Sequence, residues 1–339
     1  MFTFEPYLNL PLIWGGLIAT AIFLYVLLDG FDLGVGILFP FAPTDACRNK
    51  MMNSIAPFWD GNETWLVLGG GGLFAAFPLA YALLMPAFYI PLMAMLLGLI
   101  FRGIAFEFRF KAHARGRRLW DYSFHFGSLI AAFCQGIMLG SFVQGISVKG
   151  RVFTGGGFDW LTSFSLMTGI ALVFGYALLG ATWLIMKTDD HTQKWARRCA
   201  IYVAIYVIGF MSLVCLWVPF LNQQICQRWF SLPNLVYLSP IPLLTIWTAL
   251  SLFRSLGRQD EIRPFWLSII LFALGYAGLA VSLWPWVVPY QVSLYQAAAA
   301  PESQSLLLVG VVLFLPCVLG YTAYCYYIFR GKSHEKPWY

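Results

Sequence analysis

The chain has 339 residues, of which 60% are hydrophobic and 11% charged, and its formal net charge is +6. A soluble domain carries roughly 25% charged residues, so this chain has too little polar surface to cover a globule in water. The bilayer is the expected solvent, and 14 tryptophans suit aromatic rings at the membrane interfaces. The positive charge does not indicate nucleic-acid binding, because the basic residues are confined to loops between apolar stretches.

Apolar stretches of about 20 residues, the length that spans a bilayer, follow one another along the chain. They lie near 10–31, 53–77, 79–101, 121–146, 161–186, 199–221, 233–253, 265–287 and 305–329. The second and third meet at Pro78 and are the least distinct pair. The opening MFTFEPYLNL has no basic region and no small-residue cleavage site, so the first stretch is expected to be retained. The sequence therefore predicts an all-α integral membrane protein with about nine transmembrane helices.

The basic residues predict the orientation of these helices, since cytoplasmic loops are enriched in Lys and Arg. With the N-terminus outside, the inside segments hold 18 of the 21 basic residues, and the outside holds Lys149, Arg151 and Arg228. The inside segments are 39–52, 102–120, 187–198, 254–264 and the tail after 329. This asymmetry predicts an outside N-terminus, an inside C-terminus and an odd number of spans.

Histidines and cysteines argue against a haem or metal site on this chain. Haem in a helix bundle needs axial ligands, and of the four histidines only His125 lies in a predicted span. Because Phe124 and Phe126 flank it, His125 is interpreted as a packed residue. The seven cysteines form no CxxC pair and lie mostly in apolar runs, where they act as small core residues.

Ionisable residues within the predicted spans are costly and usually functional or paired. The last five spans contain none, whereas the first four place five acids and one arginine at their ends or just within them. These are Asp29, Asp32, Asp60, Glu63, Arg102 and Asp121. All six should lie in the cytoplasmic half at similar depth, so a bundle of the first four helices would let them converge on a site that attracts cations or holds protons.

Simpler roles exist for several of these residues. Glu63 and Asp121 could cap helix N-termini, where acids suit the helix dipole, and Arg102 could be a basic flank of its span. Asp29 and Asp32 fit that explanation less well, because acids at a helix C-terminal end oppose the dipole. Asp29/Asp32 and Asp60/Glu63 are each three residues apart, so each pair shares a helix face.

Four segments carry a resemblance to a known family. They are LLDGFDLGVGIL at 27–38, SIAPFWDGNETWL at 54–66, FRGIAFEFR at 101–109 and LWDYSFHFGS at 119–128. In content and order they resemble subunit II of cytochrome bd-type ubiquinol oxidases. The likeness is sharp in the first 145 residues, and beyond them it rests on hydropathy and on the closing TAYCYYIF run. The short loops look like those of the cyanide-insensitive branch.

The resemblance implies two four-helix bundles plus one peripheral helix. The first bundle with the polar cluster would occupy 1–146, a second and apolar bundle 147–290, and the ninth helix with its tail 291–339. It implies an obligate heterodimer with subunit I in the bacterial inner membrane, and it leaves open a small single-helix accessory subunit. Haem b558, haem b595 and haem d would lie in subunit I, which would oxidise ubiquinol while oxygen is reduced to water.

The resemblance also implies roles for single residues. Asp60 falls on the family acid implicated in delivering protons towards haem d, and Asp32, Arg102 and Asp121 on positions linked to the integrity of the haem-binding complex. Beside these roles, Asp29 and Asp32 are expected to provide a negative field that draws protons in, and Arg102 to hold one of the two ionised. Trp65 falls near the mouth proposed for an oxygen channel in some members, with Trp59 and Glu63 as supporting residues. Phe58 stands where some members have His, which puts a proton-relay role of that position in doubt.

The competing hypothesis is a secondary transporter or proton channel that acts alone. Such a protein typically has two related halves with interrupted helices and polar groups at the midplane. Here the acids lie in one half of the chain, and the second half is uniformly apolar.

Overall fold

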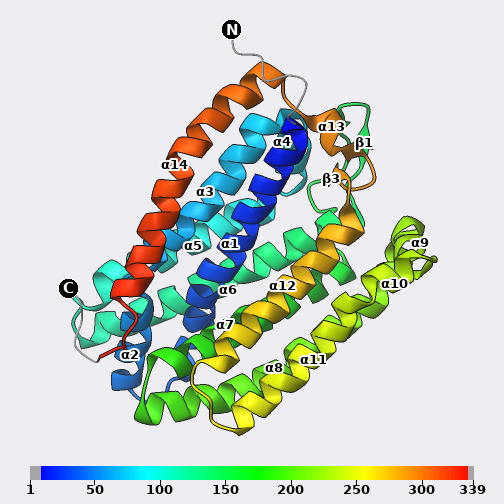
Figure 1. Ribbon diagram of the computed structural model, residues 1–339. Helices are drawn as coiled ribbons and strands as arrows, with labels where there is room; N and C mark the ends of the chain where they lie inside the picture. Colours follow the sequence, from blue (N-terminus) through cyan, green and yellow to red (C-terminus); the bar gives the residue numbers. More distant parts are fainter. Residues whose placement is uncertain (1–8, 335–339) are drawn as a thin grey trace.

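The computed structural model describes residues 9–334, which are almost entirely helical (Figure 1). In one half of the molecule α1 packs against α3 and α6, and α6 packs against α5. These helices are α1 (Leu10–Leu38), α3 (Trp59–Ala76), α5 (Tyr89–Arg109) and α6 (Ala114–Gln144). In the other half α7 (Ser163–Lys187), α8 (Asp190–Leu221), α11 (Pro240–Gly257) and α12 (Arg263–Leu283) pack together. The last long helix, α14 (Pro301–Ile328), lies along α3 and α1.

Eight helical segments in the described part are long and apolar enough to cross a membrane. The expected stretch 53–77 is not one of them, because α2 (Asp45–Ile55) ends inside it and the 18-residue α3 carries Asp60 and Glu63. The expected span 79–101 has the wrong bounds. Pro78 opens the short helix α4 (Pro78–Ala87), and α5 starts afresh at Tyr89 and continues to Arg109. Proline fits the first turn of a helix, where no backbone N–H is needed.

Short elements gather towards the end of the molecule at which α1 begins (Figure 1). Two hairpins lie there, pairing Val148 with Phe153 and Trp286 with Ser293. Their strands are β1 (Val148–Lys149), β2 (Val152–Phe153), β3 (Trp286–Val288) and β4 (Val292–Ser293). The short helices on this side are α4, α9 (Gln223–Phe230), α10 (Asn234–Leu238) and α13 (Leu294–Ala297).

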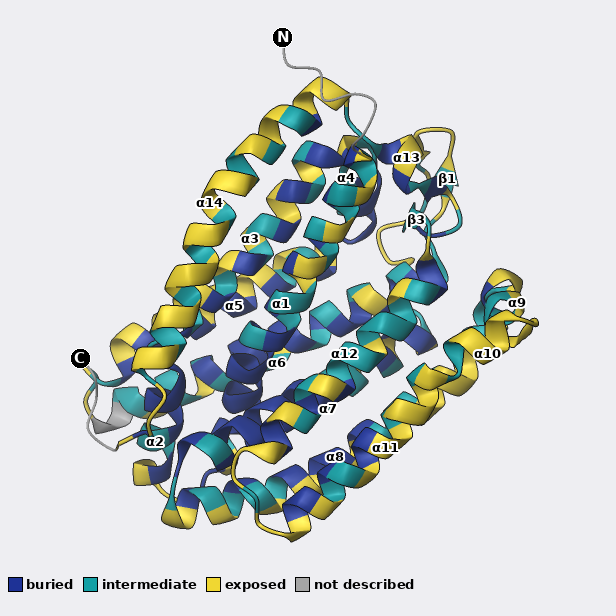
Figure 2. Cartoon of the chain, viewed as in Figure 1, coloured by how far each residue is buried: buried dark blue, intermediate teal, exposed yellow. Residues whose placement is uncertain are grey.

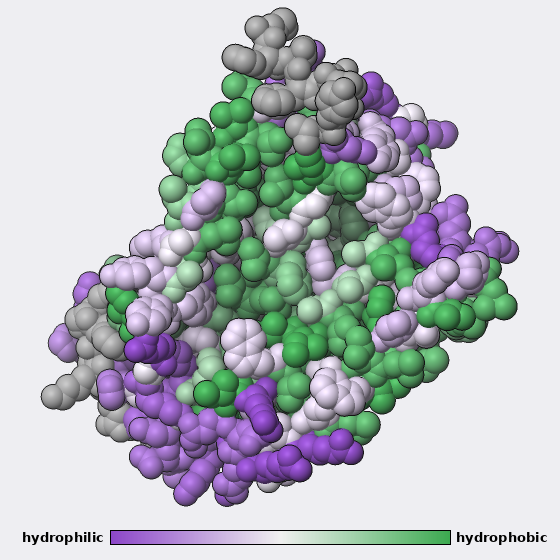
Figure 3. Space-filling view, viewed as in Figure 1, coloured by the Kyte–Doolittle hydropathy of each residue, from purple (hydrophilic) through white to green (hydrophobic). Residues whose placement is uncertain are grey.

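The opposite end collects the loops that hold most of the basic residues, and it is the hydrophilic end in Figure 3. There η1 (Phe39–Phe41) and α2 follow α1. Lys50 Nζ lies 2.7 Å from Asp189 Oδ1, and Lys332 Nζ lies 2.9 Å from Glu261 Oε2. Ser333 Oγ donates to Lys50 O. Four of the segments expected on one side of the membrane therefore share this end.

The two halves meet where α1 crosses α7. A Cβ on Gly34 would lie 1.8 Å from Tyr176 O, and one on Gly180 would lie 2.3 Å from the Gly34 carbonyl carbon. Small residues let two helix backbones approach this closely in a membrane. The crossing buries the lower part of α1 deeply (Figure 2), and that part carries the acids of the candidate site.

Candidate functional site

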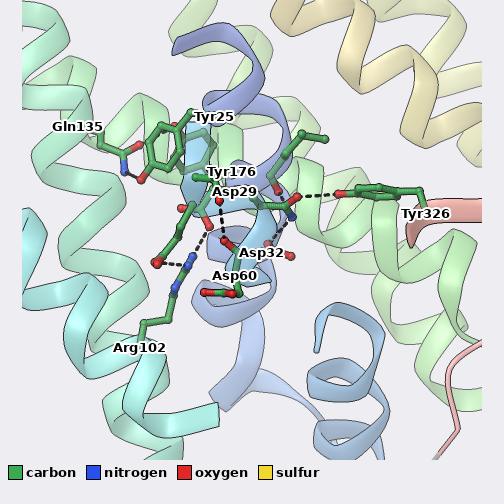
Figure 4. A network of polar contacts seen from close by, with 12 residues as sticks. Tyr25, Asp29, Asp32, Asp60, Arg102, Gln135, Tyr176 and Tyr326 are labelled. Carbon is green, nitrogen blue, oxygen red and sulfur yellow. Dashed lines mark hydrogen bonds and ion pairs between the residues drawn. The ribbon is translucent and has the colours of Figure 1, made fainter. Parts of the chain in front are cut away.

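Arg102 of α5 is the centre of a buried polar cluster (Figure 4). Its side chain is 0% exposed, and its Nη1 lies 2.6 Å from Asp29 Oδ1. Its Nη2 lies 2.6 Å from Glu63 Oε1, and the Glu63 side chain is 28% exposed. Arg102 is therefore a buried partner of two acids rather than a basic flank, and Glu63 binds a cation rather than capping a helix.

Asp29 and Asp32 lie in the interior of α1, because the helix continues to Leu38 rather than ending near residue 31. Both residues are 0% exposed. Asp29 faces Arg102, whereas Asp32 Oδ2 accepts a 2.7 Å hydrogen bond from Asn62 Nδ2. Acids in a helix interior within the membrane need such partners, since an unpaired buried charge is costly.

Asn62 links this cluster to α14. Its Nδ2 also donates to Leu28 O at 3.2 Å, and its Oδ1 accepts from the Tyr326 hydroxyl at 3.0 Å. The Tyr326 ring stacks on Phe58, with centroids 4.4 Å apart. A helix that is exposed along most of its length thus sends one hydroxyl towards the buried acids.

A second chain of polar groups reaches Asp29 from α6 and α7. The Tyr176 hydroxyl donates to Gln135 Oε1 at 2.7 Å, and Gln135 Nε2 donates to the Tyr25 hydroxyl at 2.8 Å. Tyr25 lies one turn before Asp29 on α1 and interacts with it. Each of these hydrogen bonds is donated towards Asp29, and such a chain of donors stabilises a negative charge on the Asp29 carboxyl group.

Asp60 and Trp59 occupy the first turn of α3. Asp60 is exposed, one turn before Glu63, and Figure 4 shows it beside the buried acids. Trp59 is half-buried and stacks on Phe106 with centroids 4.8 Å apart. Trp65 is 3% exposed and packs with Ala21 and Tyr25, away from the exposed face of α3.

Asp121 does not contact the Arg102 cluster. Its Oδ1 lies 2.5 Å from Nε of Arg109, which is two helical turns beyond Arg102 on α5, and Arg109 Nη1 also donates to Asn49 Oδ1 at 2.8 Å. Because α6 begins at Ala114, Asp121 is an interior residue and not a helix cap. The expected convergence of all six side chains is therefore wrong for Asp121, which lies in a separate ion pair with Arg109.

His125 is the one histidine within the predicted spans. His125 Nδ1 lies 3.3 Å from Gly36 O, and its ring packs edge-on against Phe41 and Phe126. Residues 9–334 contain no group of three His, Cys, Asp or Glu side chains placed to hold a metal ion. One partly enclosed imidazole cannot supply the ligands of several haems.

The sequence patterns missed the uncharged members of the network. Asn62, Tyr25, Gln135, Tyr176 and Tyr326 carry no charge, so a search for charged residues in the spans passes over them. Tyr326 lies in the closing TAYCYYIF run and Asn62 in FWDGNETWL, and both runs belong to the segments that carry the resemblance. Those motifs were the available signal.

Comparisons with known proteins agree on one family. The family model described as cytochrome bd terminal oxidase subunit II matches residues 10–329. The chain is 29% identical to the cytochrome bd-I ubiquinol oxidase subunit 2 of Escherichia coli K12, with 96% of each chain covered. It is 27% identical to the cytochrome bd ubiquinol oxidase subunit 2 of Bacillus subtilis, over 96% of this chain and 97% of the relative.

A solved structure shares the fold. The bd oxidase from Geobacillus thermodenitrificans contains a chain that superposes with a TM-score of 0.76 at 16% identity. The match covers 95% of this chain and 99% of that one. The family model, which spans most of the chain, confirms the resemblance read from the sequence. The chain belongs to the family of cytochrome bd terminal oxidase subunit II.

Proposed function

We propose that this chain is the haem-free subunit II of a ubiquinol-oxidising, oxygen-reducing complex, and that it carries protons from the cytoplasm towards the haems. The observation that supports this most is the buried Asp29–Arg102–Glu63 group, which reaches the protein surface through Glu63 and the exposed Asp60. Oxygen reduction consumes protons, which must cross apolar protein. A chain of carboxyl groups from a surface to a buried site can load and pass them.

The haems b558, b595 and d are proposed to lie in subunit I, an obligate partner in the bacterial inner membrane. A small single-helix subunit can complete the complex. When bound in subunit I, the haems supply the electron transfer and the oxygen chemistry. This chain contributes no axial ligand, and its residues hold protons and support the partner.

The outer face of α3 is the proposed contact with subunit I. One stripe of this helix is exposed in the isolated chain, and a Cβ on Gly71 would meet nothing within 4 Å. The stripe comprises Asp60, Thr64, Val67, Gly71 and Phe74. An acid at membrane depth cannot face lipid without a high cost, so a protein partner is expected to cover it. Asp60 would then lie between the cytoplasmic end of this chain and subunit I.

The topology proposed for this function has nine passes, with α3 as the second. The N-terminus lies outside and the C-terminus inside. The chain divides into a bundle at 1–146, a second bundle at 147–290 and a ninth helix with its tail at 291–339. Trp65, with Trp59 beside the cluster, is proposed to line a route for oxygen.

Replacement of Asp60 by Asn tests the proton role. The variant keeps the shape of the side chain but cannot carry a proton. The purified complex should assemble with normal haem content and lose most of its quinol oxidase turnover, and proton uptake in proteoliposomes should slow more than haem reduction. Arg102→Leu is the contrasting variant, since it leaves buried acids unpaired and should reduce the yield of the complex. Full turnover of Asp60→Asn from pH 6 to pH 9 would move proton entry to another residue or to subunit I.

A further inference from the structure

The buried cluster holds more acids than its cation can neutralise. Asp29, Asp32 and Glu63 lie close to Arg102, the one cation that interacts with this group in the described part of the chain, and two of them, Asp29 and Glu63, contact it directly. With all three acids ionised, the group would carry three negative charges and one positive charge. Asp29, Asp32 and Arg102 are each 0% exposed. Uncompensated charge in a dry interior is costly, and uptake of a proton by one acid relieves it.

The contacts of Arg102 distinguish the acids. Its two terminal nitrogens bind Asp29 Oδ1 and Glu63 Oε1, each at 2.6 Å. Asp32 receives no hydrogen bond from a charged group within residues 9–334, and its single donor is the neutral amide of Asn62. Asp32 Oδ1, like Asp29 Oδ2, is buried and has no hydrogen-bond partner among the described residues, but Asp29 binds Arg102 through its other oxygen. Asp32 is therefore the acid with the weakest hold on a negative charge.

The orientation of Asn62 assigns the proton to one oxygen. Leu28 O can only accept, so the amide nitrogen of Asn62 must face it, and the same nitrogen donates to Asp32 Oδ2. Asn62 Oδ1 is then the acceptor for the Tyr326 hydroxyl. Asp32 Oδ2 thus accepts a hydrogen bond, which leaves Oδ1 to carry a proton.

The groups around Asp32 favour the same assignment. Asp29 lies one turn away on α1 and Glu63 faces it from α3, and both repel a negative charge on Asp32. Arg102 faces it from α5 but is engaged by the other two acids, and Tyr326 faces it from α14 through Asn62. Two like charges and one occupied cation disfavour a third carboxylate.

We propose that Asp32 is the proton-holding site of this chain: it is neutral in the resting protein, with the proton on Oδ1, while Asp29 and Glu63 share the charge of Arg102. Asn62 and Tyr326 are positioning residues that fix the Asp32 carboxyl group. This assignment deepens the proposed proton role, and it rests on that role only for the use of the proton during turnover. The stored proton is released as H⁺, which leaves the Asp32 carboxylate.

Asp32→Asn and Asp29→Asn form a matched pair of variants in the complete oxidase complex, since both positions lie on α1 and are fully buried. Asn imitates a neutral carboxyl group and can present its oxygen to Asn62. Asp32→Asn should therefore assemble with unchanged haem content, although the resemblance links this position to the integrity of the haem-binding complex. Asp29→Asn removes an anion from Arg102 and should lower the yield of the complex several-fold.

Infrared spectroscopy of the resting complex labelled with ¹³C-aspartate detects whether the Asp32 carboxyl group is protonated. The wild type should show the carbonyl stretch of a protonated aspartic acid, shifted in D₂O, and Asp32→Asn should lose that band. Absence of the band from the wild type, its persistence in Asp32→Asn, or a loss of assembly in Asp32→Asn equal to that in Asp29→Asn would each overturn the assignment. Because no turnover is measured, this result is independent of the Asp60→Asn experiment.

Discussion

Lys187 caps the C-terminal end of α14, and Lys332 caps the C-terminal end of α7. Lys187, the last residue of α7, donates from Nζ to the Phe329 and Gly331 carbonyls at the end of α14. Lys332, which follows α14, donates from Nζ to Thr188 O at 2.9 Å, at the end of α7. The last carbonyls of a helix lack partners within the helix and carry the negative end of its dipole. These reciprocal hydrogen bonds attach the C-terminal end of α14 to α7, and Tyr326 in the last turn of α14 lies near Asn62.

Replacing Lys187 with Met should loosen this junction. The residue is 5% exposed, and its ammonium also lies 5.3 Å from the Phe58 ring centre and 5.1 Å from that of Trp183. Hydrogen bonds from a charged group contribute roughly 1.5–3 kcal/mol, so we expect a loss of about 2 kcal/mol. The thermal transition of the purified complex measures it. Lys111→Met is the control, because that side chain is 74% exposed and 3.8 Å from Glu107. Equal transitions in the two variants would contradict the capping role.

The same end of the molecule should weaken in acid. The hydrogen bond from Lys50 lowers the pKa of Asp189 below its ordinary value of 3.8, and the hydrogen bond from Lys332 lowers the pKa of Glu261 below 4.5. An acid with a lowered pKa in the folded state adds stability above its unfolded pKa and loses it as pH falls through its folded pKa. The stabilisation is thus complete at neutral pH and is lost progressively as pH falls below about 4 and through the lowered folded-state pKa values.

The size of this effect should be small, because the Asp189 and Glu261 side chains are 49% and 53% exposed and water screens both pairs. Asp189→Asn with Glu261→Gln should lower the melting temperature slightly at pH 7 and by less at pH 3.5. Melting curves at both pH values, with Glu107→Gln as an exposed control, make the comparison. If the melting temperature of the double variant differed from that of the wild type by the same amount at both pH values, Asp189 and Glu261 would not be the cause of the loss of stability in acid.

Hydropathy predicted most of the helices because a spanning helix needs only an apolar composition. Hydropathy failed to predict the bounds of a helix where the composition is apolar on both sides of the boundary. The stretch from α3 to α5 is apolar on both sides of Pro78, so nothing in its hydropathy marks the short helix α4 or the start of α5 at Tyr89. Similarly, α1 continues seven residues beyond the expected end at 31, through Gly34, which packs against α7, and Gly36, which packs against α6.

The charged part of the site was predictable because acids and arginine in a membrane must be paired. That argument brought Asp29, Glu63 and Arg102 together, and the structure confirms their contact. The same argument does not identify the basic residue with which each acid pairs. Asp121 forms its ion pair with Arg109 and not with Arg102. Neutral partners such as Asn62 and Tyr326 depend on how α14 packs against α3, which no local pattern encodes.

A bulky residue on the outer face of α3 should block assembly with subunit I. In Gly71→Leu the new Cβ meets no atom of this chain within 4 Å, so the fold of the chain should be little affected. If subunit I covers this face, the yield of the two-subunit complex should fall several-fold. Gly209→Leu on α8 is the matched control, since that glycine is also exposed with nothing within 4 Å. Co-purification with tagged subunit I measures both, and normal yield of Gly71→Leu would place the contact elsewhere.

His125→Leu should leave every haem band of the assembled oxidase intact. His125 packs between aromatic rings and faces Gly36 O, so its loss should cost packing and one hydrogen bond, about 1–2 kcal/mol. Reduced-minus-oxidised spectra of the purified complex, normalised to protein, test this. Selective loss of one haem band from a complex that still assembles would identify His125 as an axial ligand.

Reporter fusions test the proposed orientation. Lys50, Asp189, Glu261 and Lys332 lie at one end of the molecule, whereas the β1–β2 hairpin with Lys149 lies at the other. Lys and Arg are enriched in cytoplasmic loops, so the first end should be cytoplasmic. Fusions after Arg118 and after Tyr339 should report the cytoplasm, and a fusion at Lys149 should report the periplasm. A periplasmic signal after Tyr339 together with a cytoplasmic one at Lys149 would invert the protein, and the end of α3 that carries Asp60 would then lie towards the wrong side for proton uptake from the cytoplasm.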